Sequence, residues 1–252
     1  MKNVKDFYLL FFWNVIAFFI SWHIGSNYLI TITLFSLIPS LYLTIKKPSL
    51  LYKTSITSIT LTIPFVFFID YFAHADGAWF NPSVIGIRLF NFPVDDFIWG
   101  FFFLYYGIVF YEYFFDNSKR NNFPKVFKTF TLVTFVSTLI FENILILYGD
   151  ITIPYFYIIF AVLGMILVPI YVLKNHPLIL NKVYKTTIFF WFWGALYEYV
   201  ANIKQNWFFP GHHFVGHVTI LNVTIPFEEF LFVLLWAPTL ICLYEIIADD
   251  SK

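Results

Sequence analysis

The sequence predicts an all-α membrane protein, a polytopic transmembrane helical bundle of about eight spans built from two parallel-oriented repeats. Apolar residues make up 60% of the 252 residues, aromatic residues 24% and charged residues only 12%. This composition excludes an ordinary water-soluble domain. The apolar residues fall into windows that approach or reach the length needed to cross roughly 30 Å of hydrocarbon. Acidic motifs also recur at a nearly constant spacing, which indicates an internal duplication.

Charge and cysteine content exclude several function classes. The 15 lysines and arginines balance 15 aspartates and glutamates, so no basic surplus indicates a nucleic-acid partner. Cys242 is the sole cysteine, which excludes disulfide frameworks and cysteine-ligated metal clusters. Lys2 and Lys5 precede an apolar run, as in a signal peptide. Bulky Trp22 and His23 stand where a cleavage site needs small residues, so we interpret the run as the first span.

The predicted spans follow one another through the whole chain. The first two are separated by Gly25-Ser26-Asn27, which indicates a tight turn. The third and seventh windows are short and end in polar residues, so we expect these helices to tilt or to leave the membrane early. The windows are Phe7–Ile24, Tyr28–Ile45, Ile56–Phe72, Val94–Tyr113, Phe127–Leu147, Ile153–Leu173, Thr187–Ala201 and Pro226–Ile247.

The distribution of basic residues predicts the orientation, because positively charged loops stay on the cytoplasmic side. With the N-terminus inside, 13 of the 15 lysines and arginines fall on the inner side. Only Arg88 and Lys204 fall outside. The sequence therefore predicts a multi-pass protein of the cell membrane with both termini cytoplasmic.

An internal repeat is visible in the acidic motifs. Pro93-Val94-Asp95-Asp96-Phe97 returns 133 positions later as Pro226-Phe227-Glu228-Glu229-Phe230. Upstream, Asp70-Tyr71 precedes Trp79-Phe80 by nine residues, and Glu198-Tyr199 precedes Trp207-Phe208 by the same distance. The duplication predicts two similar units related by a pseudo-two-fold axis along the membrane normal.

The predicted division of the chain follows from this repeat. Residues 1–116 form a first repeat of four transmembrane helices, and residues 129–252 form a second repeat of four. Residues 117–128 form a basic cytoplasmic linker between them. An even number of spans in each unit keeps both copies in the same orientation.

Three carboxylates fall in or at the end of apolar windows. Asp70 and Glu198 occupy equivalent places in the two repeats, whereas Glu142 has no counterpart. Ionisable groups in hydrocarbon are costly and by default indicate a functional site. The alternative is that each is an interfacial residue solvated by headgroups or water.

The paired acids Asp95-Asp96 and Glu228-Glu229 admit two interpretations. Acids that follow a proline suit the first turn of a helix and its dipole. A cap needs a single carboxylate, however, and two adjacent acids in a low-dielectric place do not both ionise easily, so one keeps a proton. The helix terminus favours ionisation instead. The sequence leaves the protonation state open.

Other polar residues carry weaker signals. Glu112 and Glu245 each follow a tyrosine near an inner span end, which is typical of inner-face anchors. His213 and His217 would share a face of a helix, but the preceding Pro210-Gly211 favours a loop, so a metal site is not expected. The chain contains no glycine-rich phosphate loop, so neither flavin nor nicotinamide is expected.

The two Pro-x-acid-acid-Phe motifs resemble those of the lycopene cyclase domain family of small membrane proteins. The family occurs as two unlike subunits in some bacteria and as one fused chain in archaea and fungi. Each subunit contributes a few spans and a motif like Pro226-Phe227-Glu228-Glu229-Phe230-Leu231-Phe232. The resemblance covers essentially the whole chain. The first copy departs from the motif at Asp95-Asp96 and Trp99-Gly100, which bears on the substrate more than on the fold.

The resemblance implies a lycopene β-cyclase that uses no cofactor. Such an enzyme protonates the terminal double bond of a linear polyene, and the resulting carbocation closes a ring and then loses a proton. This chemistry needs an acid, a base and a dry aromatic pocket. The better-matching motif places the proton donor at Glu228 or Glu229. The other expected lining residues are Asp95, Asp96, Asp70 and Glu198, with Glu142 as a further candidate.

Two other functions remain open at this point. Related membrane enzymes hydrate carotenoid end groups, and duplicated halves with intramembrane acids also occur in proton-coupled transporters. Acids near one face, rather than midway, favour the enzyme. The expected partners are a lipophilic polyene such as lycopene and membrane lipid, with no nucleic acid. The oligomeric state is left open.

Overall fold

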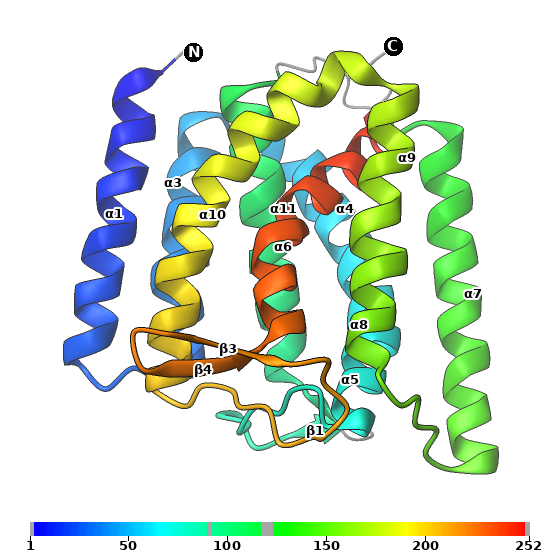
Figure 1. Ribbon diagram of the computed structural model, residues 1–252. Coiled ribbons are helices and arrows are strands. Elements are labelled where there is room, and N and C mark those ends of the chain that lie inside the picture. The colour runs from blue at the N-terminus through cyan, green and yellow to red at the C-terminus, as the bar shows by residue number, and fades with distance from the viewer. Residues whose placement is uncertain (1–2, 90–91, 117–122, 250–252) are drawn as a thin grey trace.

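The predicted all-α membrane bundle is confirmed by the computed structural model, which describes residues 3–89, 92–116 and 123–249. Seven of the described helices are long and apolar enough to cross a membrane. An eighth long helix, α10 (Leu180–Ile203), corresponds to the seventh predicted window. The helices stand side by side, and the two chain termini lie at the same end of the bundle (Figure 1).

The elements of the first half run in a simple order. A helix that begins the chain is followed by two helices with π-helical interruptions and then by a small hairpin and a straight helix. They are α1 (Val4–His23), α2 (Tyr28–Ile32), π-helical Thr33–Leu37, α3 (Ile38–Lys46), 3₁₀ Pro48–Leu50, α4 (Leu51–Pro64), π-helical Phe65–Asp70, α5 (Tyr71–Asp76), β1 (Arg88–Leu89), β2 (Phe92–Pro93) and α6 (Asp95–Phe114).

The second half has a similar order of elements. They are α7 (Lys125–Tyr148), α8 (Phe156–Phe160), π-helical Ala161–Ile166, α9 (Leu167–Asn175), 3₁₀ Pro177–Ile179, α10, β3 (His217–Ile220), β4 (Val223–Pro226) and α11 (Phe227–Ile247). The π-helical segments Thr33–Leu37 and Ala161–Ile166 start 128 residues apart, and the two proline-led 3₁₀ turns start 129 apart. These equivalences support the predicted repeat, whose boundaries stay a prediction.

Two sequence predictions need adjustment. The third span is not short, since helix runs without interruption from Pro48 to Asp76. Its first half is rich in serine and threonine, and their hydroxyls bond to carbonyls one turn back, as Thr57 does to Lys53 at 2.9 Å. This half therefore stays helical although it is less apolar. Helix α7 begins at Lys125, inside the predicted linker, and residues 117–122 lie outside the described part of the chain.

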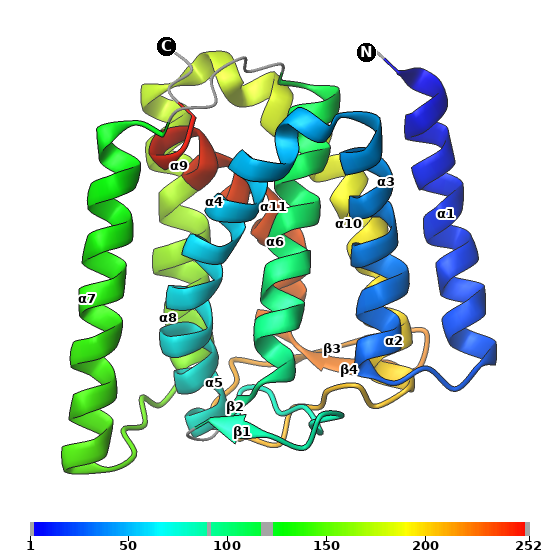
Figure 2. The ribbon, with the colours of Figure 1, turned by 180° about the vertical axis from the view of Figure 1, so that it is seen from behind.

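The centre of the bundle is formed by α6 and α11, whereas α1 and α7 lie at its edges (Figures 1 and 2). Of the apolar window of α6, 67% is buried, against 17% for α7. The two central helices approach closely at Gly107, where an added Cβ would lie 2.5 Å from Cδ2 of Leu240. The equivalent helices of the two halves therefore pack directly on each other.

A pair of reciprocal hydrogen bonds joins α6 and α11 near the end that carries the termini. Tyr111 donates to Glu245, and Tyr244 donates to Glu112. Both carboxylates are buried. The interpretation of Glu112 and Glu245 as anchors at the membrane face is therefore wrong, because each is paired with a tyrosine of the other half.

Next to this pair lies a small network of charged groups. Lys53 Nζ lies 3.0 Å from Glu112 Oε1 and 3.2 Å from Asp249 Oδ1. Asp249 follows α11 and also contacts Asp116. Burial, together with the hydrogen bond to Asp116, raises the pKa of Asp249 to about 7. The network therefore holds a carboxyl that titrates near neutral pH.

Replacing Asp249 with asparagine is expected to flatten the pH dependence of stability. Because the folded-state pKa of Asp249 lies above the ordinary value of 3.8, its stabilising contribution is complete at low pH and is lost as the pH rises toward 7. Thermal unfolding of detergent-solubilised protein between about pH 4 and pH 8 measures the slope. Asp150→Asn, at an exposed carboxyl after α7, is the control. An unchanged slope in Asp249→Asn would contradict the assignment.

Candidate active site

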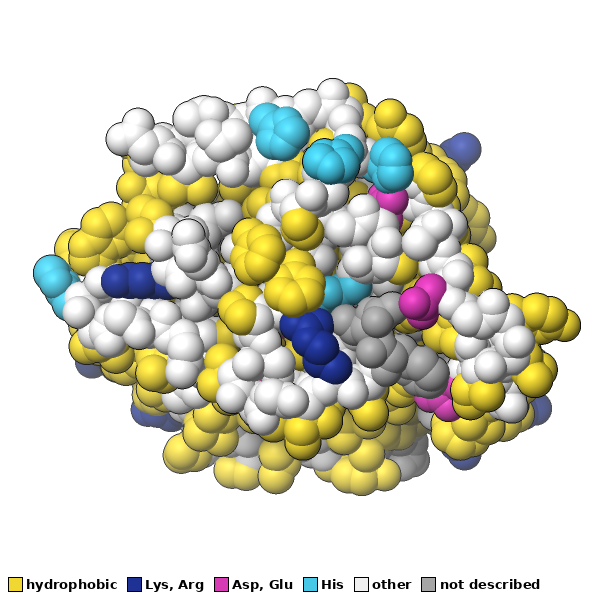
Figure 3. All heavy atoms as spheres, turned by 90° about the horizontal axis from the view of Figure 1, so that it is seen from below, with side chains coloured by type: hydrophobic (Ala, Val, Ile, Leu, Met, Phe, Trp, Pro, Cys, Tyr) yellow, Lys and Arg dark blue, Asp and Glu magenta, His cyan; other side chains and the backbone are white. Residues whose placement is uncertain are grey.

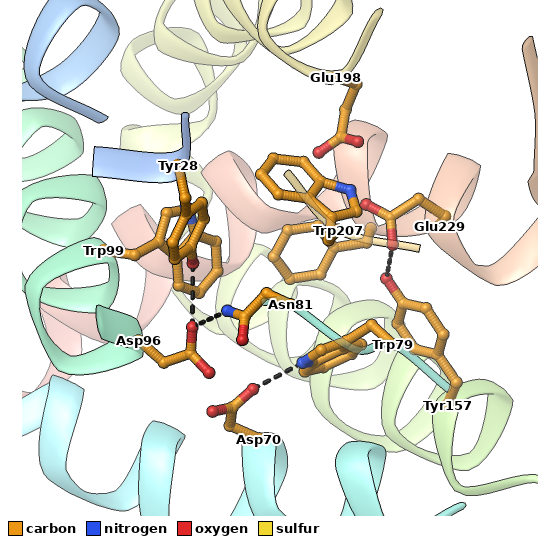
Figure 4. Close-up of a pocket in the computed structure, with 11 residues that line it drawn as sticks. Tyr28, Asp70, Trp79, Asn81, Asp96, Trp99, Tyr157, Glu198, Trp207 and Glu229 are labelled. Atoms are coloured by element: carbon orange, nitrogen blue, oxygen red, sulfur yellow. Dashed lines mark hydrogen bonds between the residues drawn. The ribbon is translucent and has the colours of Figure 1, made fainter. Parts of the chain in front are cut away.

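A polar cavity of about 50 Å³ lies inside the bundle, near the end opposite the termini (Figures 1 and 4). Both halves of the chain contribute to its walls. Four of the seven carboxylates singled out in the sequence face it, two from each half. The lining residues are Tyr28, Asp70, Trp79, Asn81, Asp96, Trp99, Tyr157, Glu198, Trp207, Glu229 and Phe232.

The paired acids reach this cavity because α6 and α11 each begin directly after a hairpin strand. Asp95 and Asp96 occupy the first turn of α6, and Glu228 and Glu229 occupy the first turn of α11. The free N–H groups of a helix N-terminus favour anionic side chains there. Neighbouring residues on a helix point about 100° apart, so only one acid of each pair can face the cavity.

The inward acid of the first half is Asp96, which forms a cluster with Asp70 and His74. His74 Nε2 lies 3.3 Å from Asp96 Oδ2 and 3.5 Å from Asp70 Oδ1. Asp70 also accepts a hydrogen bond of 2.6 Å from Trp79 Nε1. All three side chains of the cluster are almost completely buried. Two carboxyl groups therefore share one imidazole.

Two further groups bind Asp96 on its other oxygen. The Tyr28 hydroxyl donates to Asp96 Oδ1 at 3.1 Å, and the Asn81 amide donates to the same oxygen. The Asn81 carbonyl in turn accepts a 2.6 Å hydrogen bond from Arg88. Asp96 is thus surrounded by donors, an environment that stabilises a carboxylate anion.

The second half contributes the carboxyl groups of Glu229 and Glu198, which interact with each other. Tyr157 donates to Glu229 Oε2 at 2.6 Å. The indole of Trp207 and the amide of Asn202 donate to Glu198, the latter at 3.2 Å. The close-up shows both pairs of acids around one space (Figure 4).

The two pairs have matching partners with one difference. Trp79 and Trp207 stand 128 positions apart, and Tyr28 and Tyr157 stand 129 apart. Each acid pair therefore receives one indole N–H and one phenol. Position 74 holds a histidine, whereas position 202, 128 residues later, holds an asparagine. The imidazole makes the aspartate pair the more basic of the two.

The remaining acids have other roles. Asp95 accepts hydrogen bonds from Ser83 Oγ at 2.5 Å and from the Ile85 backbone N–H at 3.2 Å. Glu228 Oε1 accepts from the Val215 backbone N–H at 2.6 Å. Both acids thus fix a loop against the start of a helix. Glu142 lies partly exposed on the peripheral helix α7 and does not line the cavity.

Loops from the two halves close the cavity at this end. Phe80 and Phe208 form a two-residue antiparallel bridge with hydrogen bonds of 2.8 and 2.9 Å. Gly77 and Gly211 touch beside it, and a Cβ on Gly211 would lie 2.8 Å from the Gly77 carbonyl oxygen. Seen from this end, most of the face is hydrophobic or uncharged (Figure 3).

The histidines near this face do not share a helix. His213 lies in a loop and its Nδ1 contacts Asp76 Oδ1 at 2.6 Å, whereas His217 begins β3. The loop favoured by Pro210-Gly211 is confirmed. A metal ion could instead be held by Asp70, His74 and Asp96, whose ligand atoms all lie within 4.8 Å of one another.

Sequence reasoning missed several side chains of the site. Trp79 and Trp207 were expected to be ordinary interfacial anchors, and this is wrong, because their indoles bind Asp70 and Glu198. His74 was not considered, although it stands four residues after Asp70, on the same helix face. Repeating the search at an offset of 128 or 129 would have found the tryptophans, the tyrosines and position 74 together.

Comparison with known families gives one match. The lycopene cyclase family model matches residues 27–114. The matched segment contains Tyr28, Asp70, His74 and Asp96, which are all the cavity groups that surround the first acid pair except the loop residues' backbone. The match supports assignment to the lycopene cyclase domain family. Neither a curated protein nor a solved structure matches the chain.

Proposed function

We propose that this chain, a member of the lycopene cyclase domain family, closes β rings on the ends of a linear lycopene-like carotenoid. The reaction is an isomerisation that starts with an acid and involves no net redox change. The observation that carries the proposal is the arrangement of two buried acid pairs around one small cavity walled by aromatic rings. One pair can give a proton and the other can take one.

The proposed reaction conserves protons and electrons. A carboxylic acid transfers its proton to the terminal double bond, and a tertiary carbocation forms. The electron pair of the next double bond attacks this cation and forms the ring C–C bond. A carboxylate then removes a ring proton, and the remaining electron pair becomes the ring double bond. One proton enters and one leaves.

The partners of each pair support a division of roles. Glu229, with Glu198 behind it, is the proton donor, because Asn202 supplies no positive charge to favour the ionised form. Asp96, with Asp70, is the proton acceptor, because His74 and several donors stabilise its carboxylate. The indole of Trp99 and the ring of Phe232 lie at the cavity and can stabilise the passing cation through their π faces.

Glu198 gives the proton donor a route to the outside. In addition to the cavity, Glu198 lines a groove of about 170 Å³ between α10 and α11. Asp70, Asp96 and Glu229 are each at most 5% exposed, whereas Glu198 is partly exposed. This arrangement allows Glu229 to recover its proton through Glu198 after each turnover.

A carotenoid end-group hydratase is the second candidate. The cavity of about 50 Å³ has room for a few water molecules, since one needs roughly 10 to 15 Å³. A water there would capture the same carbocation and give an alcohol. The hydratase would use the same acid, so the product separates the two functions.

Pigments extracted from cells that make lycopene, with and without this protein, test the proposal. We expect a shift from red to yellow, because each ring closure takes one double bond out of planar conjugation. A more polar product would identify the hydratase. Unchanged lycopene in cells with membrane-inserted protein would contradict both enzymes and favour a transporter.

The repeat and the orientation also enter the proposal. We propose that each repeat contributes one acid pair and that both termini face the cytoplasm, which places the cavity in the outer half of the membrane. The equivalent partners at offsets of 128 and 129 residues support the first point. The basic residues at the end that carries the termini support the second.

A further inference from the structure

A second cavity, of about 350 Å³, adjoins the polar one and is almost entirely apolar. It lies between α4, α6, α9 and α11, and its lining includes Phe65, Phe103, Val168 and Trp236. Trp99 and Phe232 line both cavities. These two side chains therefore form the constriction through which the apolar cavity leads to the four carboxylates.

The apolar cavity is elongated along α11. Its lining runs from Phe232 to Leu243 on this helix, which corresponds to about 16 Å at 1.5 Å per residue. The far end is reached by Phe130, a partly exposed residue of the peripheral helix α7. A polyene about as long as the roughly 30 Å hydrocarbon core would fit only half of its length here.

The corresponding space in the other half of the bundle is filled by rings. Leu61, Phe65 and Ile69 line the cavity, and the residues 128 positions later are Phe189, Trp193 and Tyr197. These three side chains are at most 3% exposed.

The filling rings are also held in place. Trp193 stacks on Tyr197 with ring centroids 4.9 Å apart and donates a 2.8 Å hydrogen bond to the Phe35 carbonyl. Phe189 stacks on Phe110 at 4.1 Å. Of the two equivalent seams between α6 and α11, one is therefore open and the other is closed by packed aromatic side chains.

We propose that the apolar cavity holds one half of a linear polyene, with its end group at the Trp99–Phe232 constriction, so that the protein closes one end per binding event. The inference rests on the proposed function. The second end reaches the carboxylates only after the product leaves and returns in the opposite direction. The volume suits a single ligand, since small-molecule sites span about 300 to 1,000 Å³.

A pulse-chase experiment with lycopene tests the order of events. Purified protein in detergent receives labelled lycopene, followed during turnover by an excess of unlabelled lycopene. We expect free labelled monocyclic product to appear first and the chase to stop its conversion to bicyclic product. Monocyclic product alone would also support one end per event. Labelled bicyclic product that forms through the chase, with no free monocyclic product, would overturn the inference.

A cavity-filling variant tests the binding site itself. Val168→Trp places a large ring in the inner part of the apolar cavity, whereas Leu167→Trp, at the adjacent residue with 48% exposure, points away from it. We expect Val168→Trp to lower kcat/KM for lycopene about tenfold or more, the scale on which apolar pockets discriminate. A half-length acyclic hydrocarbon with the same end group should be spared. Leu167→Trp should change neither substrate.

The outcomes separate the inference from the function on which it rests. If the wild-type protein leaves lycopene unchanged, the proposed function fails. If the wild-type protein is active and both tryptophan variants cyclise lycopene equally, only the placement of the polyene fails. Equal loss on the long and the short substrate in Val168→Trp would indicate general damage, and would also overturn the placement.

Discussion

Glu229→Gln is expected to abolish detectable ring formation, with a rate loss of about 10² to 10⁴, the usual contribution of a general acid. Glutamine keeps the size of the side chain and can still accept the 2.6 Å hydrogen bond from Tyr157, but it has no acidic proton. The measurement is the amount of cyclised product per unit of membrane-inserted protein in cells that make lycopene.

Glu228→Gln is the matched control, because it changes the adjacent residue in the same way. Glu228 binds the Val215 backbone N–H and holds the loop before β3. Its loss should lower stability and yield by roughly the 0.5 to 2 kcal/mol of a helix cap, with product still made by each inserted molecule. Normal cyclisation by Glu229→Gln, or loss of activity only in Glu228→Gln, would contradict the assignment of the donor.

Asp96→Asn is expected to cause a loss of similar size and, in addition, to change the product. The acid still protonates the substrate in this variant, but the preferred acceptor of the final proton is gone. The ring cation then loses a proton from another carbon, and the residual product carries its ring double bond in another position. Chromatography with absorption spectra distinguishes these ring isomers. Glu229→Gln should give no such shift, because it blocks the first step.

Asp95→Asn is the control for this variant. Asp95 holds Ser83 and the Ile85 backbone, and its carboxyl does not line the cavity. The variant should make the wild-type product at reduced yield of protein. If Asp96→Asn made the normal ring isomer at the wild-type rate, the acceptor would have to be another group, and Asp70→Asn would be the next variant to examine.

The bundle was predictable because hydropathy and the repeat are properties of the chain alone. Predicted span boundaries such as Tyr28–Ile45 and Val94–Tyr113 differ by one residue from the observed ends. Four of the carboxylates that face the cavity were also found, because an acid in an apolar window has few other reasons to be there. Two of these, Asp70 and Glu198, were recognised as equivalent in both repeats.

What could not be predicted depends on rotation and on packing. Asp95 and Asp96 are indistinguishable by composition and spacing, and only the docking of the hairpin decides which of them faces inward. The roles of Trp79 and Trp207 depend on loops that turn back under the bundle. The open seam depends on whether Phe65 or Trp193 fills a space, which no periodicity encodes.

The bridge between Phe80 and Phe208 decides the fate of a reactive intermediate. A carbocation in contact with water becomes an alcohol, whereas one in a dry space survives long enough to meet an internal double bond. The bridge, with Gly77 and Gly211 beside it, is the barrier that stands between bulk water and the four carboxylates. Small changes in these two loops would therefore be enough to turn a ring-forming protein into one that makes hydroxylated ends, with every acid left in place.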